Sequence, residues 1–465
     1  MAIATVDPST GETLKTFDAL GPDEVEERLA RAAEAFAAHR RTGFGERAAL
    51  LSRAADLLEA DTDAVARTVT TEMGKPLAAA RAEAAKCVKA MRWYAEHAAG
   101  LLADEQPSAA VVEDSGASRA FVRYRPLGPV LAVMPWNFPL WQVIRFAAPA
   151  LMAGNTALLK HASNVPQTAL YLDDLFRRAG YRPGCFQTLL VGSGEIEGIL
   201  RDSRVAAATL TGSEPAGRSV ASIAGDEIKK TVLELGGSDP FLVLPSADID
   251  AAARTAVTAR VQNAGQSCIA AKRFLVHADV WDAFTERFVE RMAALTVGDP
   301  MAEGTDVGPL SSEQGRADLE ELVADAVRKG ARTLCGGRRP AGLDRGWFHE
   351  PTVLTGITEE MRIHREETFG PVAGLYRVGD LDEAVALAND TSFGLSSNAW
   401  TRDPAEQERL VADLEAGGVY FNGMTASHPG LPFGGVKRSG YGRELAGHGI
   451  REFCNVTTVW FGAEE

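Results

Sequence analysis

Short apolar runs alternate with helical stretches along most of this chain, and no other feature restricts its fold as strongly. The runs lie at residues 130–134, 156–159, 186–190, 206–210 and 230–233. Helical stretches separate most of them, for example residues 165–179 and 215–223. Strands that alternate with helices in this way form a parallel sheet with helices on both faces. The pattern therefore predicts an α/β fold.

A second series of the same kind begins after the glycine pair Gly236-Gly237. Its first apolar runs are residues 241–243 and 274–276, with a helical stretch at residues 251–261, and similar units continue to about residue 419. The glycine pair therefore marks a predicted boundary between two α/β domains.

The two ends of the chain have different patterns. Residues 22–100 carry apolar positions at helical spacing and predict a helical region. Residues 118–125 alternate apolar and charged side chains, which is typical of a strand. Residues 455–460 predict a second strand after the glycine-rich segment 432–444. An unpaired terminal strand favours aggregation, so we expect this one to pair.

Composition and charge exclude several classes of protein. The 465 residues carry a net charge of −15, which gives no electrostatic reason to bind nucleic acid or an anionic membrane. Five scattered cysteines show no metal-site spacing, so neither a metal site nor a disulfide framework is expected, and a cytoplasmic location fits. Residues 126–144 are uncharged, but their prolines exclude a lipid-exposed helix.

Cys268 and Glu234 supply the two groups that covalent chemistry on a carbonyl carbon requires. Cys268 follows the polar turn Gly265-Gln266-Ser267. Glu234 ends a predicted strand, and the carboxyl ends of parallel strands face the crevice where ligands bind. A thiol with a separate base is a usual arrangement for such catalysis. The alternatives are an inert buried Cys and a solvated Glu at a strand end.

Asn137 is a candidate donor to an oxyanion. It stands between Pro135 and Pro139, which restrict the loop and could hold the side-chain amide in place. The alternative is a turn Asn that bonds only the local backbone.

These segments, together with Glu366-Glu367-Thr368-Phe369-Gly370-Pro371, resemble the NAD(P)-dependent aldehyde dehydrogenase superfamily in content and order. The resemblance runs from about residue 7 to residue 460 and is closest to bacterial succinate semialdehyde dehydrogenases. It implies that Cys268 is the nucleophile and that Glu234 activates water. It also implies that Asn137 and the Cys268 N–H stabilise the oxyanion.

The resemblance further implies a division of the chain. Residues 1–106 and 127–235 would form a Rossmann-type cofactor-binding domain, and residues 236–431 an α/β catalytic domain. Residues 107–126 and 445–465 would form a small β arm that joins the subunits of a homodimer or homotetramer.

A dinucleotide site is also implied. Residues 210–217 follow a strand and open a helix, where N–H groups can meet a pyrophosphate. Lys160 would bind the adenosine ribose. Ser163 stands where NAD-selective members carry Glu, which favours NADP without excluding NAD. The residues assigned to the cofactor are Trp136, Lys160, Ser163, Thr211, Gly212, Ser213, Gly217, Leu235, Glu367 and Phe369.

The substrate residues implied by the family pattern are Arg145, Gln262 and Ser427. Arg145 matches a substrate-binding Arg, and a surface or interdomain salt bridge is its alternative. Gln262 stands where some succinate semialdehyde enzymes carry a second Arg. Ser427 precedes the glycine-rich segment, and a carboxylate substrate needs such donors.

The sequence thus predicts oxidation of an aldehyde to its acid through a Cys thioester, with succinate semialdehyde as the expected substrate. The alternatives are another semialdehyde, an apolar aldehyde, transfer of the acyl group to coenzyme A, or a non-enzymatic binding protein. Glu234 argues against acyl transfer because it provides a base for hydrolysis.

Overall fold

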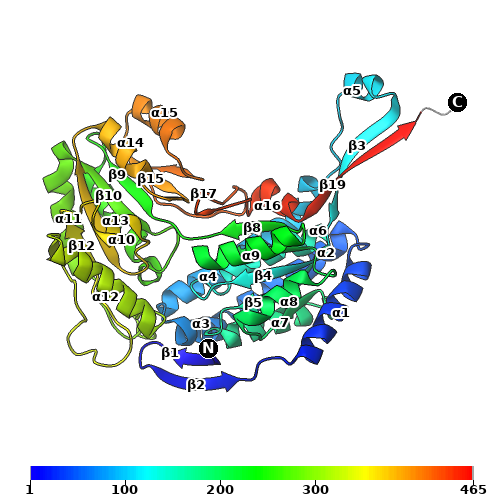
Figure 1. The fold of residues 1–465 in the computed structure, drawn as a ribbon, viewed down its shortest axis with the longest axis horizontal. Helices are drawn as coiled ribbons and strands as arrows, with labels where there is room; N and C mark the ends of the chain where they lie inside the picture. Colours follow the sequence, from blue (N-terminus) through cyan, green and yellow to red (C-terminus); the bar gives the residue numbers. More distant parts are fainter. Residues whose placement is uncertain (1, 463–465) are drawn as a thin grey trace.

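The computed structural model describes residues 2–462 and contains two lobes and a projecting arm (Figure 1). One lobe is built on a six-stranded sheet with the order β18-β8-β7-β4-β5-β6. Five strands are parallel and β18 is antiparallel to β8. The strands are β4 Pro129–Met134, β5 Thr156–His161, β6 Phe186–Thr188, β7 Ala207–Thr211, β8 Lys230–Glu234 and β18 Gly440–Tyr441.

Helices cover both faces of this sheet, because successive side chains of a buried strand point in opposite directions. In β4, Val130 and Ala132 pack into the larger core cluster, while Leu131 packs into a separate cluster with residues of the other covering helices. The helices that cover the two faces of the sheet are α1 Pro22–His39, α6 Trp141–Ala153, α7 Pro166–Arg178, α8 Ile196–Arg201 and α9 Glu214–Asp226, with the short η1 Ser193–Glu195 before α8.

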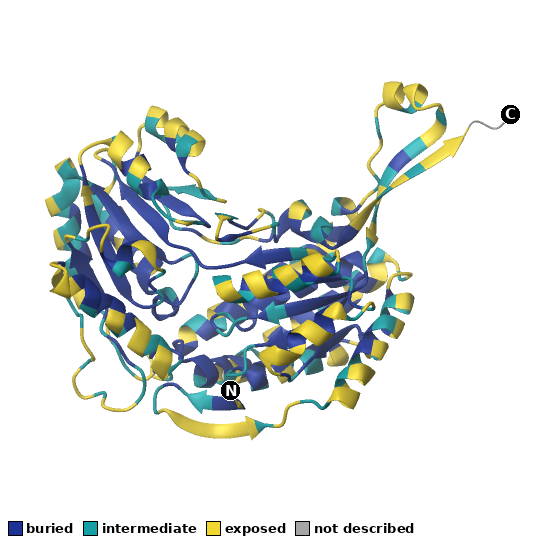
Figure 2. Cartoon of the chain, in the orientation of Figure 1, coloured by how far each residue is buried: buried dark blue, intermediate teal, exposed yellow. Residues whose placement is uncertain are grey.

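The predicted helical region contains three further helices, α2 Phe44–Ala60, α3 Thr62–Met73 and α4 Leu77–Leu101. Helices α2 and α4 pack on α6, which is buried along its whole length, and α3 packs on α4 and α7. A hairpin of β1 Ile3–Asp7 and β2 Glu12–Phe17 precedes them. The sequence analysis did not predict this hairpin, because β2 is almost wholly exposed and has no apolar face to recognise (Figure 2).

The second lobe is built on a seven-stranded sheet with the order β11-β12-β13-β10-β9-β15-β16, parallel except for the β11–β12 pair. Its strands are β9 Asp239–Val243, β10 Ala271–His277, β11 Arg332–Cys335, β12 Thr352–Thr355, β13 Val372–Val378, β15 Ser397–Trp400 and β16 Val419–Phe421. Its helices are α10 Ile249–Val261, η2 Gln262–Gly265, η3 Ala278–Val280, α11 Trp281–Ala293, α12 Glu313–Arg328, α13 Arg362–Arg365, α14 Leu381–Asn389 and α15 Pro404–Asp413. The predicted α/β fold class is confirmed.

The last part of the chain returns from the second lobe to the first. Strand β17 Val436–Lys437 pairs with β14 Phe393–Gly394, and β18 then joins the six-stranded sheet beside β8. In that pairing Gly440 lies opposite Glu234. The glycine-rich segment therefore lies against the end of β8, where Glu234 is located.

The arm consists of β3 Ala117–Pro126 paired antiparallel with β19 Cys454–Gly462, with α5 Ala109–Asp114 at its tip and α16 Ala446–Glu452 at its base. It projects from the body, and most of its surface is exposed (Figures 1 and 2). Val456, Trp460 and Phe461 are exposed on it. Within residues 2–462, no helix is long and apolar enough to cross a membrane.

Candidate active site

Cys268 lies in the connection between α10 and β10, where the backbone makes an unusual turn. Asn263, Ala264 and Gly265 all have positive φ angles, of 56°, 53° and 74°. A Cβ on Gly265 would lie 2.2 Å from the carbonyl oxygen of Gly370, so only glycine fits there. Strain of this kind in non-glycine residues persists only where surrounding contacts hold it, and it gathers at functional sites.

Lys272 holds the Cys268 end of this turn. Its Nζ donates to the carbonyl oxygens of Ser267 at 2.8 Å and Cys268 at 2.6 Å, and it lies 3.2 Å from a carboxylate oxygen of Glu367. Burial raises the pKa of the Cys268 thiol to about 12, while the charges of Lys272 and Arg145 act in the opposite direction. In this arrangement the thiol is protonated at neutral pH.

The loop between β4 and α6 brings Asn137 to the cysteine turn. The Asn137 side-chain amide donates to the carbonyl oxygen of Gln266 at 3.0 Å, and the Asn263 amide donates to the carbonyl oxygen of Asn137 at 2.8 Å. Glu83 accepts from the N–H groups of Leu140 and Trp141 at the start of α6, both at 2.9 Å. The Asn137 side chain is therefore held within two residues of Cys268 along the turn.

Glu234 ends β8 and is buried. Neither carboxylate oxygen has a hydrogen-bond partner among the described residues. Burial raises the pKa of Glu234 to about 8, and the charge of Arg145 opposes this rise. A Cβ on Gly434 would lie 2.7 Å from Glu234 Oε1, so the glycine-rich segment approaches the carboxyl closely. A carboxyl with this pKa ionises at mildly alkaline pH, and the carboxylate can then accept a proton.

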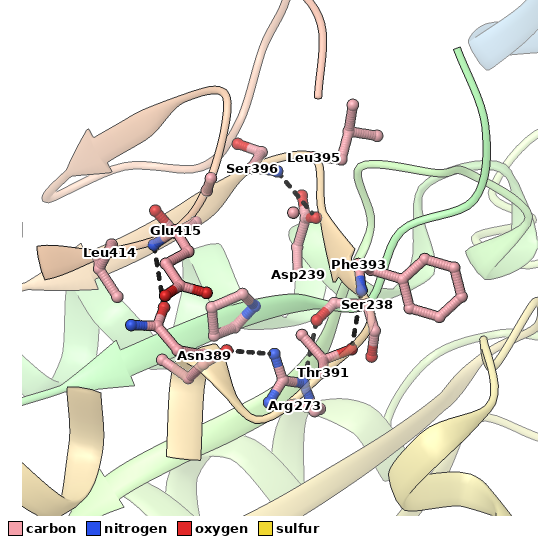
Figure 3. Close-up of a pocket in the computed structure, with 15 residues that line it drawn as sticks. Ser238, Asp239, Arg273, Asn389, Thr391, Phe393, Leu395, Ser396, Leu414 and Glu415 are labelled. Atoms are coloured by element: carbon pink, nitrogen blue, oxygen red, sulfur yellow. Dashed lines mark hydrogen bonds between the residues drawn. The ribbon is translucent and has the colours of Figure 1, made fainter. Parts of the chain in front are cut away.

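The segment after Glu234 supports the cysteine turn from behind. A Cβ on Gly237 would lie 2.6 Å from the carbonyl oxygen of Cys268, so the two backbones are in contact. Figure 3 shows how this segment is held: Arg273 Nε donates to the Ser238 carbonyl at 3.0 Å, and the Ser396 N–H donates to Asp239 at 3.1 Å. Since the arginine belongs to β10 and Ser396 precedes β15, the seven-stranded sheet fixes the wall behind the thiol.

A cavity of about 220 Å³ opens on Cys268. Seven of the residues predicted for the cofactor line it, together with Asn137 and the thiol: Trp136, Thr211, Gly212, Ser213, Leu235, Glu367 and Phe369. The rings of Trp136 and Phe369 meet edge to face, with centroids 5.8 Å apart. The remaining three predicted cofactor residues, Lys160, Ser163 and Gly217, do not line it.

Those three residues lie in the same lobe as the cavity's cofactor-side lining, on or next to β5 and α9. Lys160 is in β5, beside β4, and Ser163 follows that strand. Gly217 is in α9, where a Cβ would lie 2.6 Å from a methyl group of Leu235, so a larger residue would displace that side chain.

A second cavity, of about 500 Å³, lies beside the first along the same two segments. Asn137 lines the first cavity, and the neighbouring Phe138 lines the second with Gln262, Asn263 and Lys86. The cysteine turn and the Asn137 loop thus separate two spaces. Such a division suits two reactants that must meet at one thiol.

Arg145 lies near Glu234 but already has a charged partner. Its guanidinium forms a buried ion pair with Glu444, and its Nη2 lies 3.4 Å from the Thr211 hydroxyl. It also stacks over the ring of Phe433 at 4.8 Å. A cation on the fully buried helix α6 needs such a partner, because an unpaired buried charge is costly. The structure therefore shows Arg145 in a buried salt bridge, whereas the alternative expected from the sequence was a surface or interdomain one.

Comparison with known proteins agrees with this geometry. The model of the "Aldehyde dehydrogenase family" matches residues 1–459. The chain belongs to the aldehyde dehydrogenase family. A relative from Mycobacterium bovis, "Succinate-semialdehyde dehydrogenase [NADP(+)] 1", is 64% identical over 461 residues, covering 99% of this chain and 100% of the relative. A relative of the same name from Mycobacterium ulcerans is 63% identical over 463 residues, with the same coverage.

Solved structures of other aldehyde dehydrogenases have the same fold. Succinic semialdehyde dehydrogenase from Streptococcus pyogenes, solved in complex with NADP+, gives a TM-score of 0.95 at 35% identity and covers 99% of this chain and 100% of that chain. An NAD-dependent aldehyde dehydrogenase from Sinorhizobium meliloti also gives 0.95 at 33% identity, covering 100% and 92%. Because both superpose equally well, the fold of this aldehyde dehydrogenase does not by itself decide between the two dinucleotides.

Sequence reasoning missed three charged residues at this aldehyde dehydrogenase site. Glu444 pairs with Arg145, Lys272 holds the cysteine turn, and Lys86 reaches Ser427 with Nζ 2.7 Å from the hydroxyl oxygen. Lys272 lies four residues after the cysteine and could have been found from that spacing. Glu444 and Lys86 are remote in sequence from Cys268 and carried no local signal.

Proposed function

We propose that this protein oxidises succinate semialdehyde to succinate with NADP, through a thioester on Cys268. The observation that carries the proposal is that Cys268 and Asn137 line the 220 Å³ cavity, while the buried Glu234 directly precedes Leu235 and Gly236 of the same lining and acts on the pKa of the thiol. The names of the relatives at 64% and 63% identity support both the aldehyde and the dinucleotide. NAD is a second, less favoured cofactor.

The residues around the first cavity fit a dinucleotide. Ser213, the N-cap of α9, makes no side-chain cap hydrogen bond, so the N–H groups of Glu214 and Ala216 in the first turn are available to a pyrophosphate. Glu367 and Phe369 would hold the nicotinamide ribose and ring, and Lys160 and Ser163 the adenosine ribose. When bound, the nicotinamide accepts the hydride that leaves the substrate carbon.

The protein's own groups would carry the remaining steps. The Cys268 thiol would first lose its proton to solvent, a step that the charges of Lys272 and Arg145 favour, and the thiolate then attacks the aldehyde carbon. The Asn137 amide and the Cys268 N–H receive the negative charge that develops on the aldehyde oxygen. Loss of hydride leaves a thioester. Glu234 then removes a proton from water, which attacks the thioester, and the carboxylic acid and the free thiol are released.

Substrate and product analysis tests this function. Purified protein is incubated with succinate semialdehyde and NADP, with and without coenzyme A, and NADPH and organic products are measured. We expect NADPH and free succinate in equal amounts, independent of coenzyme A. A product that forms only with coenzyme A would support the acylating alternative. Faster oxidation of other aldehydes in a substrate panel would change the proposed substrate.

We also propose the domain roles and the assembly. Residues 1–106 and 127–235 would bind the cofactor, residues 236–431 would carry the thiol, and residues 107–126 and 445–465 would join subunits of a cytoplasmic homodimer or homotetramer. The exposed Val456, Trp460 and Phe461 on the arm support a role in association. Light scattering of the intact protein and of a Trp460→Ser variant tests it; a monomeric wild type would contradict it.

A further inference from the structure

Lys86 on α4 is a charged residue of the second cavity without an acidic partner. Its Nζ lies 2.7 Å from the Ser427 hydroxyl oxygen and 4.2 Å from the centroid of the Trp141 ring. Within residues 2–462, no carboxylate oxygen lies within 4.0 Å of this Nζ. The side chain is partly buried. A partly buried ammonium group of this kind gains free energy when an anion joins it.

Three other cations around the site each have a carboxylate beside them. Lys75, on the segment before α4, forms a fully buried pair with Glu83. Lys272 lies beside Glu367, and Arg145 pairs with Glu444. Unlike these three cations, Lys86 has no carboxylate partner among residues 2–462 and keeps its charge available to a ligand.

The surroundings of Lys86 add uncharged donors. Ser427 accepts from Lys86, which leaves its own O–H free to donate. Gln262 lines the same cavity, and its Nε2 is buried without a hydrogen-bond partner among the described residues. An unpartnered buried donor is costly unless a ligand satisfies it. An ammonium, a hydroxyl and an amide N–H together suit a carboxylate.

Lys86 is also close to the reacting group. Burial lowers the pKa of Lys86 to about 8, with a further contribution from the charge of Arg145, and Cys268 is near enough to act in the opposite direction. The ammonium is therefore largely protonated at neutral pH and lies within electrostatic reach of the thiol. A short aldehyde could bridge the two groups.

We propose that Lys86 binds the distal carboxylate of the substrate, with Ser427 and Gln262 as additional donors, and so selects short aldehydes that end in a carboxylate. This inference rests on the proposed function and assigns the anion-binding role to α4 instead of to Arg145. The Trp141 ring beneath the ammonium fixes its position.

Substrate discrimination in Lys86 variants tests the proposal. The ratio of kcat/KM for succinate semialdehyde to kcat/KM for butanal, an uncharged aldehyde with the same number of carbons, is measured in the wild type, Lys86→Met and Lys86→Arg. We expect Lys86→Met to lower the ratio by roughly 30-fold or more, which equals about 2 kcal/mol. Lys86→Arg should retain most of the ratio, because it keeps the charge.

Lys89→Met is the matched control. Lys89 lies on the same helix but is exposed and lines a different surface groove. The Lys89→Met variant should therefore have the same ratio of the two kcat/KM values as the wild type. An unchanged ratio in Lys86→Met would overturn the inference, and so would equal losses for both aldehydes. Binding of NADP, measured separately, checks that the variants are folded.

The pH dependence of the wild-type ratio provides a test that needs no variant. The pH dependence of kcat/KM reports the protonation state of the free enzyme. The ratio of kcat/KM for succinate semialdehyde to that for butanal should therefore fall about tenfold between about pH 7 and pH 9, as Lys86 loses its proton. The charged and titratable groups that act on Lys86 are Glu83, Cys87, Arg145 and Cys268, and His428 directly follows its partner Ser427 in the chain. These groups act on both aldehydes, so their effects largely cancel in the ratio. A ratio that stays constant over this range would contradict the proposal.

The experiment separates failure of the inference from failure of the proposed function. If the wild type oxidises butanal better than succinate semialdehyde, the proposed substrate is wrong. If the wild type prefers succinate semialdehyde and Lys86→Met keeps that preference, the substrate stands and another group binds the carboxylate.

Discussion

Replacement of Glu234 by Gln should separate the two halves of the reaction. The Glu234 side chain is buried, and neither of its oxygens has a partner within the described part of the chain. Gln has nearly the same shape but cannot accept a proton from water. Hydride transfer precedes the step that needs this base, so the variant should still form the thioester. We therefore expect a burst of NADPH near one equivalent per active site, followed by slow turnover.

The size of the effect follows from the environment of the carboxyl. With a pKa of about 8, about a tenth of the Glu234 side chains are ionised at pH 7. General-base catalysis contributes roughly 10²–10⁴-fold, or about 3–5 kcal/mol. We expect the steady-state rate of Glu234→Gln to fall by at least about 100-fold near pH 8. A base acts when it is deprotonated, so the wild-type rate should rise as the pH increases toward 8, and the variant should lose this rise.

Stopped-flow absorbance of NADPH measures both the burst and the slow steady-state turnover. The measurements cover roughly pH 6 to pH 9, because Glu234 titrates near pH 8. Glu195→Gln, an exposed position in η1, serves as the control and should match the wild type. Loss of the burst itself would place Glu234 before hydride transfer. Turnover near the wild-type rate would refute its role as the base.

Three further substitutions test other parts of the site. Cys268→Ala should abolish aldehyde oxidation and leave NADP binding in equilibrium titrations nearly unchanged, and measurable turnover would refute the thioester. Ser163→Glu should repel the 2′-phosphate of NADP. The ratio of kcat/KM for NADP to kcat/KM for NAD should therefore fall by about 10–100-fold, or about 1.5–3 kcal/mol. An unchanged ratio would place Ser163 away from that phosphate. Arg145→Leu should leave Glu444 as an unpaired buried charge, at a cost of about 3–5 kcal/mol in stability. Thermal unfolding and kinetics should then show losses for charged and uncharged aldehydes alike, whereas a loss confined to succinate semialdehyde would return Arg145 to the substrate carboxylate.

The elements that could be predicted are those with a regular local pattern. The apolar run at residues 130–134 predicts a buried strand, and β4 occupies Pro129–Met134. The same holds for the α/β alternation as a whole. The hairpin β1–β2 was missed because β2 has no buried face, so its pairing with β1 depends on neighbours and not on its own periodicity.

The site was predictable to the extent that its residues lie in short motifs. The first cavity brings together Cys268, Asn137 and seven predicted cofactor residues, each from a segment that could be recognised in the sequence. The left-handed backbone of Asn263 and Ala264 could not be predicted, because non-glycine residues adopt it only where the fold forces them.

Charge pairing explains why the substrate side was harder to predict than the cofactor side. A sequence shows that Arg145 is a cation on an apolar helix, but it does not show that Glu444 neutralises it. Lys86 has no acidic partner within residues 2–462, although in the sequence it looks like an ordinary helix residue. Whether a cation has an acidic partner depends on contacts that form only in the folded chain. A residue that matches the family pattern can therefore be paired already and unable to bind the substrate. We therefore expect the carboxylate of the substrate to bind a cation without an acidic partner, such as Lys86 on α4.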